Sequence, residues 1–376
     1  MNKKTKLFTL IFFLLLPKTV NSYWAFITTP FRLARFVFSS TLSGGANIYF
    51  LGQIINFAYQ KFNSSSPFYR LEQKISLSKM PSSLKSELYE EIKYAQLSHS
   101  EERAGGTHAF INQVLHFPWR KKKEPEADLK KIYQRIDSKI FGMHKIKKLV
   151  LDLFFAYHEG RIKHISPLCL YGPPGTGKTA FAVALAKALN LPYIIISATG
   201  ANDPDAFFRG SLRTYVGSAP GFFFSAFSQL QCINPLIIID EIDKQAVGNH
   251  RGTIQNVLLQ ALDPVQNKRF RDYYLNHDID ISNAFIITTA NDINLISDPL
   301  QDRMLMVKVD EYSEKEREII ASTIIWNKIK GTYKIPPDVK KQFIQKALLK
   351  TAETRIFRSL KKILTKKINR WLRLNS

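Results

Sequence analysis

One stretch of the chain, the run GPPGTGKT from Gly172 to Thr179, constrains the fold more than any other. An apolar run ending at Tyr171 precedes it, and the helical pattern TAFAVALAKAL follows it. In this strand–loop–helix order, a glycine-rich loop turns successive backbone N–H groups toward phosphate groups at the positive end of a helix. The chain therefore has to build a buried strand and a helix around an anion site, which favours an α/β fold.

Two side chains of this run have the chemistry of a nucleotide triphosphate site. Lys178 would reach the β- and γ-phosphates of ATP, and Thr179 would ligate Mg²⁺. ATP and Mg²⁺ are therefore the expected cofactors. The residues that we expect to contact them are Gly172, Pro173, Pro174, Gly175, Thr176, Gly177, Lys178, Thr179 and, further along the chain, Asp240.

A second signature, formed by acidic residues, follows about sixty residues after the phosphate loop. The run PLIIIDEID predicts a buried strand whose carboxyl end presents Asp240 and Glu241. Asp240 would hold the metal through water, and Glu241 would orient and deprotonate an attacking water. An acidic pair at this place favours hydrolysis over phosphoryl transfer to a small molecule.

Two further polar residues come after predicted strands. Asn291 ends the run AFIITTAN, where its amide could hydrogen-bond the attacking water or the γ-phosphate, or could cap the following turn. Arg303, in PLQDRMLMV, could offer its guanidinium to the γ-phosphate of a neighbouring subunit and stabilise charge in the transition state. Taken alone, Arg303 could equally be a surface ion-pair residue.

Short apolar runs alternate with helical patterns across the middle of the chain, which is typical of a parallel sheet covered by helices. The runs are residues 167–171, 192–197, 235–240 and 284–289. Upstream, the periodicity predicts two helices over 71–96, broken at Met80-Pro81, and a third through THAFINQVLHF. Past Tyr312 the pattern is helical to the end.

These signatures, in this order, resemble an AAA+ ATPase module, and more closely the ATPase part of Lon proteases. The resemblance covers about residue 69 to near the carboxyl terminus, and the upstream runs SKMP and FINQVLHFPW are similar to the helical arm before the Lon ATPase. The stretches that carry it are LYGPPGTGKT, RGSLRTYVGSAPG, NPLIIIDEIDK, LDPVQNKRFRDYYLNHDIDIS, FIITTAN and DRM.

The resemblance implies an AAA+ P-loop fold, with a parallel five-stranded sheet flanked by helices and a helical lid, assembled into a hexameric ring. In such rings a loop like RTYVGSAPG lines the central pore, so Tyr215 and Val216 would grip a polypeptide substrate. Gly217, Ser218 and Gly221 would let that loop move, and a second pore loop would fall around 248–252. Arg303 matches the arginine finger.

The resemblance is weaker near the carboxyl terminus. Arg358, in RIFRSLKK, matches the sensor-2 arginine of the lid, although Ile356-Phe357 stand where the family has Gly-Val. The sequence ends at Ser376, and no segment resembles the Ser–Lys protease domain of Lon. We therefore expect ATPase activity without protease activity, and a separate peptidase is a possible partner.

The two ends of the chain differ in composition from its middle. An apolar run from Leu7 to Leu16 after a basic start is similar to a secretory signal peptide or an anchor, so we expect membrane association, on a side that the sequence does not fix. From Lys340 onward, twelve Lys or Arg stand against the single acid Glu353, and the whole chain carries a net charge of +23. A solvated helix face, anionic lipid, nucleic acid or an acidic partner would each fit this excess.

Two cysteines, Cys169 and Cys232, lie in apolar runs, which argues against a disulfide framework or a zinc site. We expect four parts, which are 1–68 (an apolar, signal-like or membrane-associated segment), 69–122 (a helical arm), 123–311 (the nucleotide-binding domain) and 312–376 (a helical lid). The preferred function is ATP-driven remodelling or translocation of proteins. The alternatives are a nucleotide-dependent assembly or tether at a membrane and a DNA-directed motor.

Overall fold

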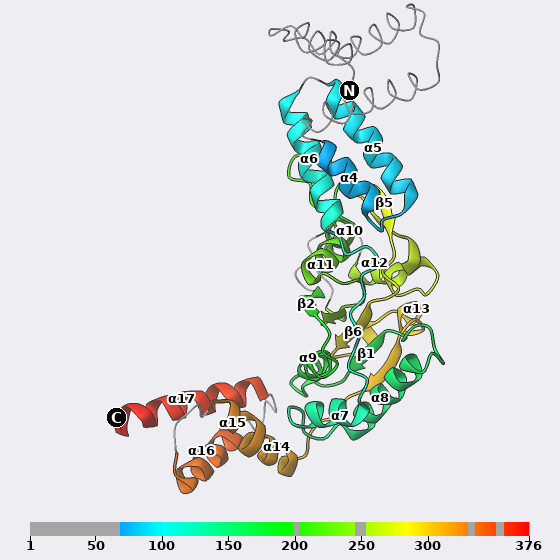
Figure 1. Cartoon of the computed structure of the whole chain (residues 1–376). Helices are drawn as coiled ribbons and strands as arrows, with labels where there is room; N and C mark the ends of the chain where they lie inside the picture. Colours follow the sequence, from blue (N-terminus) through cyan, green and yellow to red (C-terminus); the bar gives the residue numbers. More distant parts are fainter. Residues whose placement is uncertain are drawn as a thin grey trace, which may run out of the picture. The chain divides into compact units, whose positions relative to one another are not determined.

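The computed structural model describes most of the chain beyond its amino-terminal segment (Figure 1). The described residues are 68–98, 100–198, 203–244, 253–329, 335–350 and 357–375. The chain divides into two compact units, Met1–Ser76 and Leu77–Ser376. In the first unit the description covers Phe68 and helix α4 (Tyr69–Leu77) up to Ser76. The expected apolar segment, 1–68, thus lies almost entirely outside the described residues.

A five-stranded parallel sheet forms the centre of the second unit, in the order β2-β3-β6-β1-β7. Its strands are β1 (Leu168–Tyr171), β2 (Tyr193–Ser197), β3 (Leu236–Asp240), β6 (Phe285–Ala290) and β7 (Leu305–Lys308). The predicted α/β fold with a parallel five-stranded sheet is confirmed. Because all five strands run the same way, the loops after β1, β3 and β6 meet at one edge.

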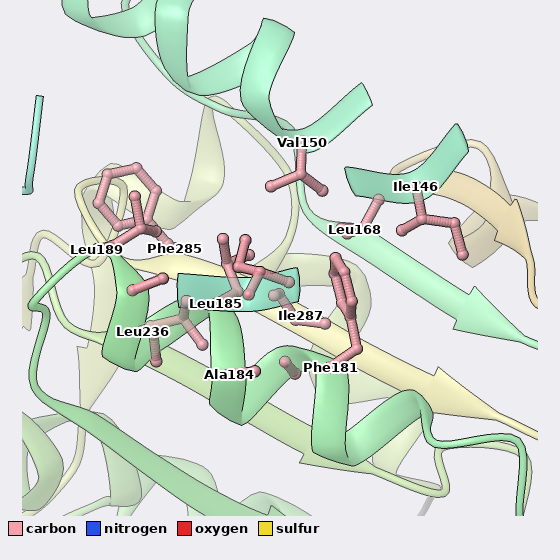
Figure 2. Packing of buried hydrophobic residues seen from close by; sticks show 14 of the residues in the cluster. Ile146, Val150, Leu168, Phe181, Ala184, Leu185, Leu189, Leu236, Phe285 and Ile287 are labelled. Atoms are coloured by element: carbon pink, nitrogen blue, oxygen red, sulfur yellow. The ribbon is translucent and has the colours of Figure 1, made fainter. Parts of the chain in front are cut away.

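The face of the sheet shown in Figure 2 packs against α8 (His144–His158) and α9 (Lys178–Ala188). Helix α7 (Leu129–Asp137) packs against these two helices and contributes to the same apolar core. Phe181 and Leu185 of α9 lie against Leu236 of β3 and Ile287 of β6, and all four side chains are buried. Ile237 and Ile239 of β3 alternate with these residues, so they project from the opposite face, and they are also fully buried. A sheet buried on both faces explains the continuous apolar runs in the sequence.

Shorter elements form a second packed region. They are α10 (Pro204–Arg209), α11 (Phe222–Leu230), α12 (Ile254–Ala261), η2 (Gln266–Arg269), η3 (Ile293–Leu295), α13 (Asp298–Gln301) and the antiparallel pair β4 (Phe270–Asp272) and β5 (His277–Ile279). Phe222, Phe223 and Phe224 are buried, and Phe223 contacts both Phe208 and Phe270. The triple phenylalanine therefore supplies core packing, as its apolar character indicates.

Two antiparallel helices, α5 (Ser82–Leu97) and α6 (Glu101–His116), form what we call the arm. The helix break at Met80-Pro81 lies where the sequence predicts it. Helix α6 begins earlier than the predicted run THAFINQVLHF, because the Ser100 side chain accepts a hydrogen bond from the Arg103 N–H and caps the helix. Beyond α6, the ring of Phe117 stacks on Phe224 of α11 at a centroid distance of 5.0 Å.

The carboxyl-terminal helices pack around a core of their own. They are α14 (Glu314–Ile320), the π-helical turn η4 (Ala321–Ile325), α15 (Trp326–Ile329), α16 (Pro337–Lys350) and α17 (Phe357–Asn375). Trp326, Ile344 and Leu364 are among the buried residues of this core. The predicted helical lid is confirmed. Among the described residues, no helix combines the length and apolarity needed to cross a membrane.

Candidate functional site

The glycine-rich loop lies between β1 and α9 and has a backbone that few residues other than glycine could adopt. Gly172 has φ +145°, and a Cβ there would stand 2.2 Å from the carbonyl oxygen of Val309. Gly177, with φ +94°, is the N-cap of α9. The loop thus delivers its backbone to the first turn of a helix, where N–H groups and the helix dipole favour a phosphate.

Lys178 is buried at the centre of this loop. Its ammonium donates to the carbonyl oxygens of Gly172 (2.7 Å) and Pro173 (2.9 Å) and to Oδ1 of Asn291 (3.1 Å). Burial lowers the pKa of Lys178, and the nearby carboxylates of Asp243, Asp240 and Glu241 act in the opposite direction. A desolvated cation favours an anion beside it, so this environment suits a phosphate group.

Thr179 and Asp240 meet at the edge of the sheet. The Thr179 hydroxyl donates to Oδ1 of Asp240 at 2.8 Å, and the hydroxyl of Thr289 donates to the same oxygen. Three elements contribute, since Thr179 lies in the first turn of α9, Asp240 ends β3 and Thr289 lies in β6. Hydroxyl and carboxylate oxygens are the ligands that Mg²⁺ prefers, so the residues present fit that ion.

Glu241 leaves β3 with an unusual backbone. Its φ is +61°, a left-handed conformation that costs a residue other than glycine roughly 1 kcal/mol or more. Its N–H donates to Oγ1 of Thr289 at 3.1 Å, and its carboxylate forms an ion pair with Lys244 at 2.7 Å. The Glu241 side chain is 35% exposed, so the carboxylate is accessible to water next to the half-buried Asp240–Thr179 pair.

Arg303 lies in the turn between α13 and β7 and contacts a different set of residues. Its Nη1 donates to the carbonyl oxygen of Pro299 at 2.9 Å, and its Nε lies 3.4 Å from Oδ2 of Asp263. Backbone N–H groups of Gln266 and Val265, and then Arg303 itself, hold the pKa of Asp263 below its usual value. Within the described part of the chain, no hydrogen bond or ion pair joins Arg303 to the nucleotide-site residues named above.

The loop at residues 210–221, which we call the Tyr215 loop, is closed at its base and exposed at its tip. Gly210 and Pro220 form an antiparallel bridge, and the Ser211 N–H donates to the carbonyl oxygen of Ala219 at 3.0 Å. At the tip, the Tyr215 side chain is 65% exposed and Val216 is fully exposed. The aromatic ring is therefore not buried in the core of its own subunit.

Comparison with known proteins agrees with these features. Residues 168–309 match the family model described as "ATPase family associated with various cellular activities (AAA)". The chain is 33% identical over 348 residues to Lon protease 2 of Borreliella burgdorferi, an alignment that covers 88% of this chain and 42% of that protein. It is 37% identical over 253 residues to the Lon protease of Rhizobium meliloti, covering 67% of this chain and 31% of that protein.

The chain contains a Lon-type AAA+ module. It spans less than half the length of these curated relatives. The Lon resemblance read from the sequence is thus confirmed for the ATPase region, and the AAA family supports ATPase activity. Proteolysis is named for the relatives and is not carried over to this chain.

The structure also brings residues to this AAA+ site that the sequence analysis did not single out. Asp243 is buried, and its Oδ2 accepts the N–H groups of Asn291 (2.9 Å) and Asp292 (3.2 Å). Among the described residues, Oδ1 of Asp243 has no hydrogen-bond partner. Asp243 thus fixes the backbone at Asn291, which in turn contacts Lys178. In the sequence, only the third acid of the run DEID could have indicated a role for Asp243.

The turn before α8 is a second feature that was missed. A Cβ on Gly177 would lie 3.7 Å from Cε of Met143, so this side chain borders the phosphate loop. The hydroxyl of Tyr312 donates to the carbonyl oxygen of Phe141 at 3.1 Å, and burial raises the pKa of Tyr312 to about 12. An apolar pair around Gly142, directly before a helix, was the signal in the sequence.

Two predicted elements fall outside the description. The expected second pore loop at 248–252 lies outside the described residues. Arg358 lies in the first turn of α17, but its side chain is not among those described. The sensor-2 assignment of Arg358 therefore stays a prediction.

Proposed function

We propose that this AAA+ module binds ATP with Mg²⁺, hydrolyses it, and uses the turnover to move a polypeptide gripped by the Tyr215 loop. The observation that carries the proposal is the exposure of Tyr215 (65%) and Val216 (fully exposed) at the tip of a loop whose base is hydrogen-bonded shut. Exposed aromatic surface outside a core is available to a partner, and a closed base can transmit force to it.

At the nucleotide site, each proposed role follows from a contact. Lys178 would exchange its carbonyl contacts for phosphate oxygens, and Thr179 and Asp240 would hold the metal. When bound, Mg²⁺ neutralises negative charge that develops on the phosphates. Glu241, accessible beside them, would accept the proton of the attacking water, and Asn291 would orient that water or the γ-phosphate.

The base and sugar of the nucleotide need contacts beyond the phosphate loop. Met143 borders Gly177, and Tyr312 supports the backbone of Phe141 in the same turn. We assign this turn to the nucleotide base because it places an apolar side chain beside Gly177, where the phosphate loop meets α9. The helical lid begins directly after Tyr312, so closure over the base would couple nucleotide binding to lid position.

Arg303 suggests that the site is completed by a second copy of the chain. Its own-chain partners are Asp263 and Pro299, and neither belongs to the nucleotide site. An arginine finger acting between subunits requires a ring, and we propose a hexamer on the strength of the Lon relationship. Polypeptide substrates and a possible separate peptidase belong to the same proposal.

One experiment separates this function from its two alternatives. ATP hydrolysis is measured for the protein alone, with an unfolded polypeptide, and with double-stranded DNA. Stimulation by polypeptide supports translocation. The DNA-directed alternative, favoured by the basic residues of α16 and α17, requires stimulation by DNA instead. Turnover that neither partner stimulates would leave the tether alternative.

Membrane association is a separate proposal that rests on the apolar run from Leu7 to Leu16. A basic start followed by such a run has the layout of a signal peptide or an anchor. Cell fractionation combined with protease protection tests both attachment and sidedness. Recovery of the full chain in the fraction without membranes would contradict it.

A further inference from the structure

Arg213, two residues before Tyr215, makes contacts that extend beyond the Tyr215 loop. Its guanidinium makes a two-pronged ion pair with the carboxylate of Glu91 in α5, in which Nη1 donates to Oε2 at 3.0 Å and Nη2 donates to Oε1. The same guanidinium lies 3.6 Å from the ring centroid of Phe110 in α6. One side chain of the Tyr215 loop therefore contacts both helices of the arm.

This contact is unlike the others that the loop makes. At the tip, Tyr215 donates its N–H to Leu212, and Ser218 donates to Tyr215, both within the loop. Among residues 212–218, all of which the structure describes, only Arg213 makes a side-chain hydrogen bond or a ring contact to another element. Arg213 is thus the lateral support of an otherwise exposed tip.

The β4–β5 hairpin joins the same place from the other side. The hydroxyl of Tyr274 donates to Oε1 of Gln113 in α6 at 2.8 Å, and its ring meets Phe110 edge to face at 5.8 Å. Two residues earlier, Asp272 accepts the N–H of Gly221, at the far end of the Tyr215 loop, at 2.9 Å. The arm therefore contacts the loop beside its tip directly, through Arg213, and contacts the far end of the loop indirectly, through the hairpin.

We propose that Arg213 is a positioning residue through which the arm sets the orientation of the Tyr215 tip. The proposal rests on the function assigned above, in which that tip grips polypeptide. The side chains of Arg213 and Glu91 are each 31% exposed, so the ion pair is hydrated enough to open and close. Displacement of the arm by a bound partner would release the tip and lower polypeptide-stimulated turnover, while the nucleotide site stays intact.

The test combines a mobility readout with an activity readout on the full chain. For the mobility readout a spin label is attached at Val216→Cys, since both natural cysteines are buried and Val216 is fully exposed, and hydrolysis is measured on unlabelled chains that keep Val216. Arg213→Gln, which removes the charge and the cation–π contact, is compared with Arg271→Gln as a matched control. The Arg271 side chain is 41% exposed and pairs with Asp278 in the hairpin, and it forms no hydrogen bond, ion pair or ring contact with the loop tip at 212–218, all of which the structure describes.

We expect Arg213→Gln to sharpen the spectrum of the label and to lower polypeptide-stimulated hydrolysis several-fold, with basal hydrolysis unchanged. Arg213→Lys keeps the charge but cannot form both hydrogen bonds of the guanidinium, so its label mobility and its stimulated hydrolysis should lie between those of Arg213→Gln and the natural protein. Arg271→Gln should change neither readout. Melting temperatures of all variants, measured alongside, identify any that fail to fold, and Glu91→Gln then replaces Arg213→Gln.

Two results would overturn the proposal, and a third would overturn the function on which it rests. An unchanged label spectrum would show that Arg213 does not hold the tip. A mobile tip with unchanged stimulation would show that the support has no functional consequence. If the natural protein shows no stimulation by polypeptide, the assigned function fails, and the label spectrum alone decides whether Arg213 holds the tip.

Discussion

The nucleotide site and the Tyr215 loop are built in opposite ways within one domain. At the nucleotide site, buried and half-buried polar groups from different elements bond to one another, as when Asp240 accepts from both Thr179 and Thr289. At the Tyr215 loop, the backbone closes the base, the tip is exposed, and one guanidinium supports it from the side. Chemistry that needs fixed geometry is placed on rigid elements, and a gripping surface is placed where it can move.

The largest expected effect tests whether Arg303 belongs to the nucleotide site at all. Arg303→Ala should lower ATP hydrolysis by about 10³–10⁵-fold with ATP affinity largely kept, because the guanidinium stabilises charge only in the transition state. Steady-state hydrolysis and nucleotide binding are measured together. Arg271→Ala, which removes another partly exposed arginine with an acidic partner, serves as the control and should behave like the natural protein.

Mixing experiments sharpen the same point. Rings mixed from Arg303→Ala and Glu241→Gln chains should recover part of the activity, since each chain supplies what its neighbour lacks. No recovery in any mixture would argue for a site completed within one chain. In that case the Asp263 ion pair would be the whole role of Arg303.

A somewhat smaller effect is expected for Glu241, the proposed general base. Glu241→Gln should lower hydrolysis by about 10²–10⁴-fold while ATP still binds, because the amide keeps the shape but accepts no proton. Lys178→Ala should instead lose nucleotide binding, as it removes the buried cation. Lys244→Gln removes only the partner of the Glu241 ion pair and is the matched control. Turnover by Glu241→Gln at the natural rate would contradict the assignment.

The smallest predicted effect concerns the base of the Tyr215 loop. Asp272 is buried, and burial raises the pKa of its carboxyl to about 6. The backbone N–H groups of Leu275, Gly221 and Tyr274 favour the charged form and offset part of this rise in pKa. The folded state therefore holds this proton over a range where the unfolded chain releases it. The free energy of unfolding should fall as pH rises from about 4 to 6, by at most about 3 kcal/mol.

Chemical unfolding at a series of pH values checks this dependence. Asp272→Asn should flatten the curve over that window, although it also loses one backbone hydrogen bond. Asp278→Asn, in the same hairpin and 43% exposed at its side chain, should leave the curve unchanged. Equal curves for the natural protein and Asp272→Asn would mean that the loop base is less tightly buried than the account requires.

The sheet was predictable because its strands are short apolar runs, and β1, β3 and β6 lead directly into residues with recognisable chemistry. The hairpin was not, since the strands FRD and HDI are three residues long and largely polar. The start of α6 was missed because Gly105 and Gly106 interrupt the helical pattern, whereas the cap at Ser100 decides it.

The two regions also differ in what the sequence could reveal about them. Lys178, Thr179, Asp240 and Asn291 follow the strands of one parallel sheet, so topology alone brings them together. Arg213 and Glu91 are 122 residues apart and lie on elements whose packing no local pattern specifies. Contacts of that kind depend on tertiary packing of the arm, which periodicity does not encode.

The behaviour of Tyr215→Ala tests most directly whether the exposed tip moves polypeptide. We expect basal ATP hydrolysis within a few-fold of the natural rate and an unchanged melting temperature, together with loss of polypeptide stimulation and of unfolding of a tagged substrate. A buried tyrosine would instead lose about 3–5 kcal/mol of stability on truncation. A strongly destabilised variant, or one that still unfolds the substrate at the natural rate, would contradict the claim that the exposed tip is driven by the buried site.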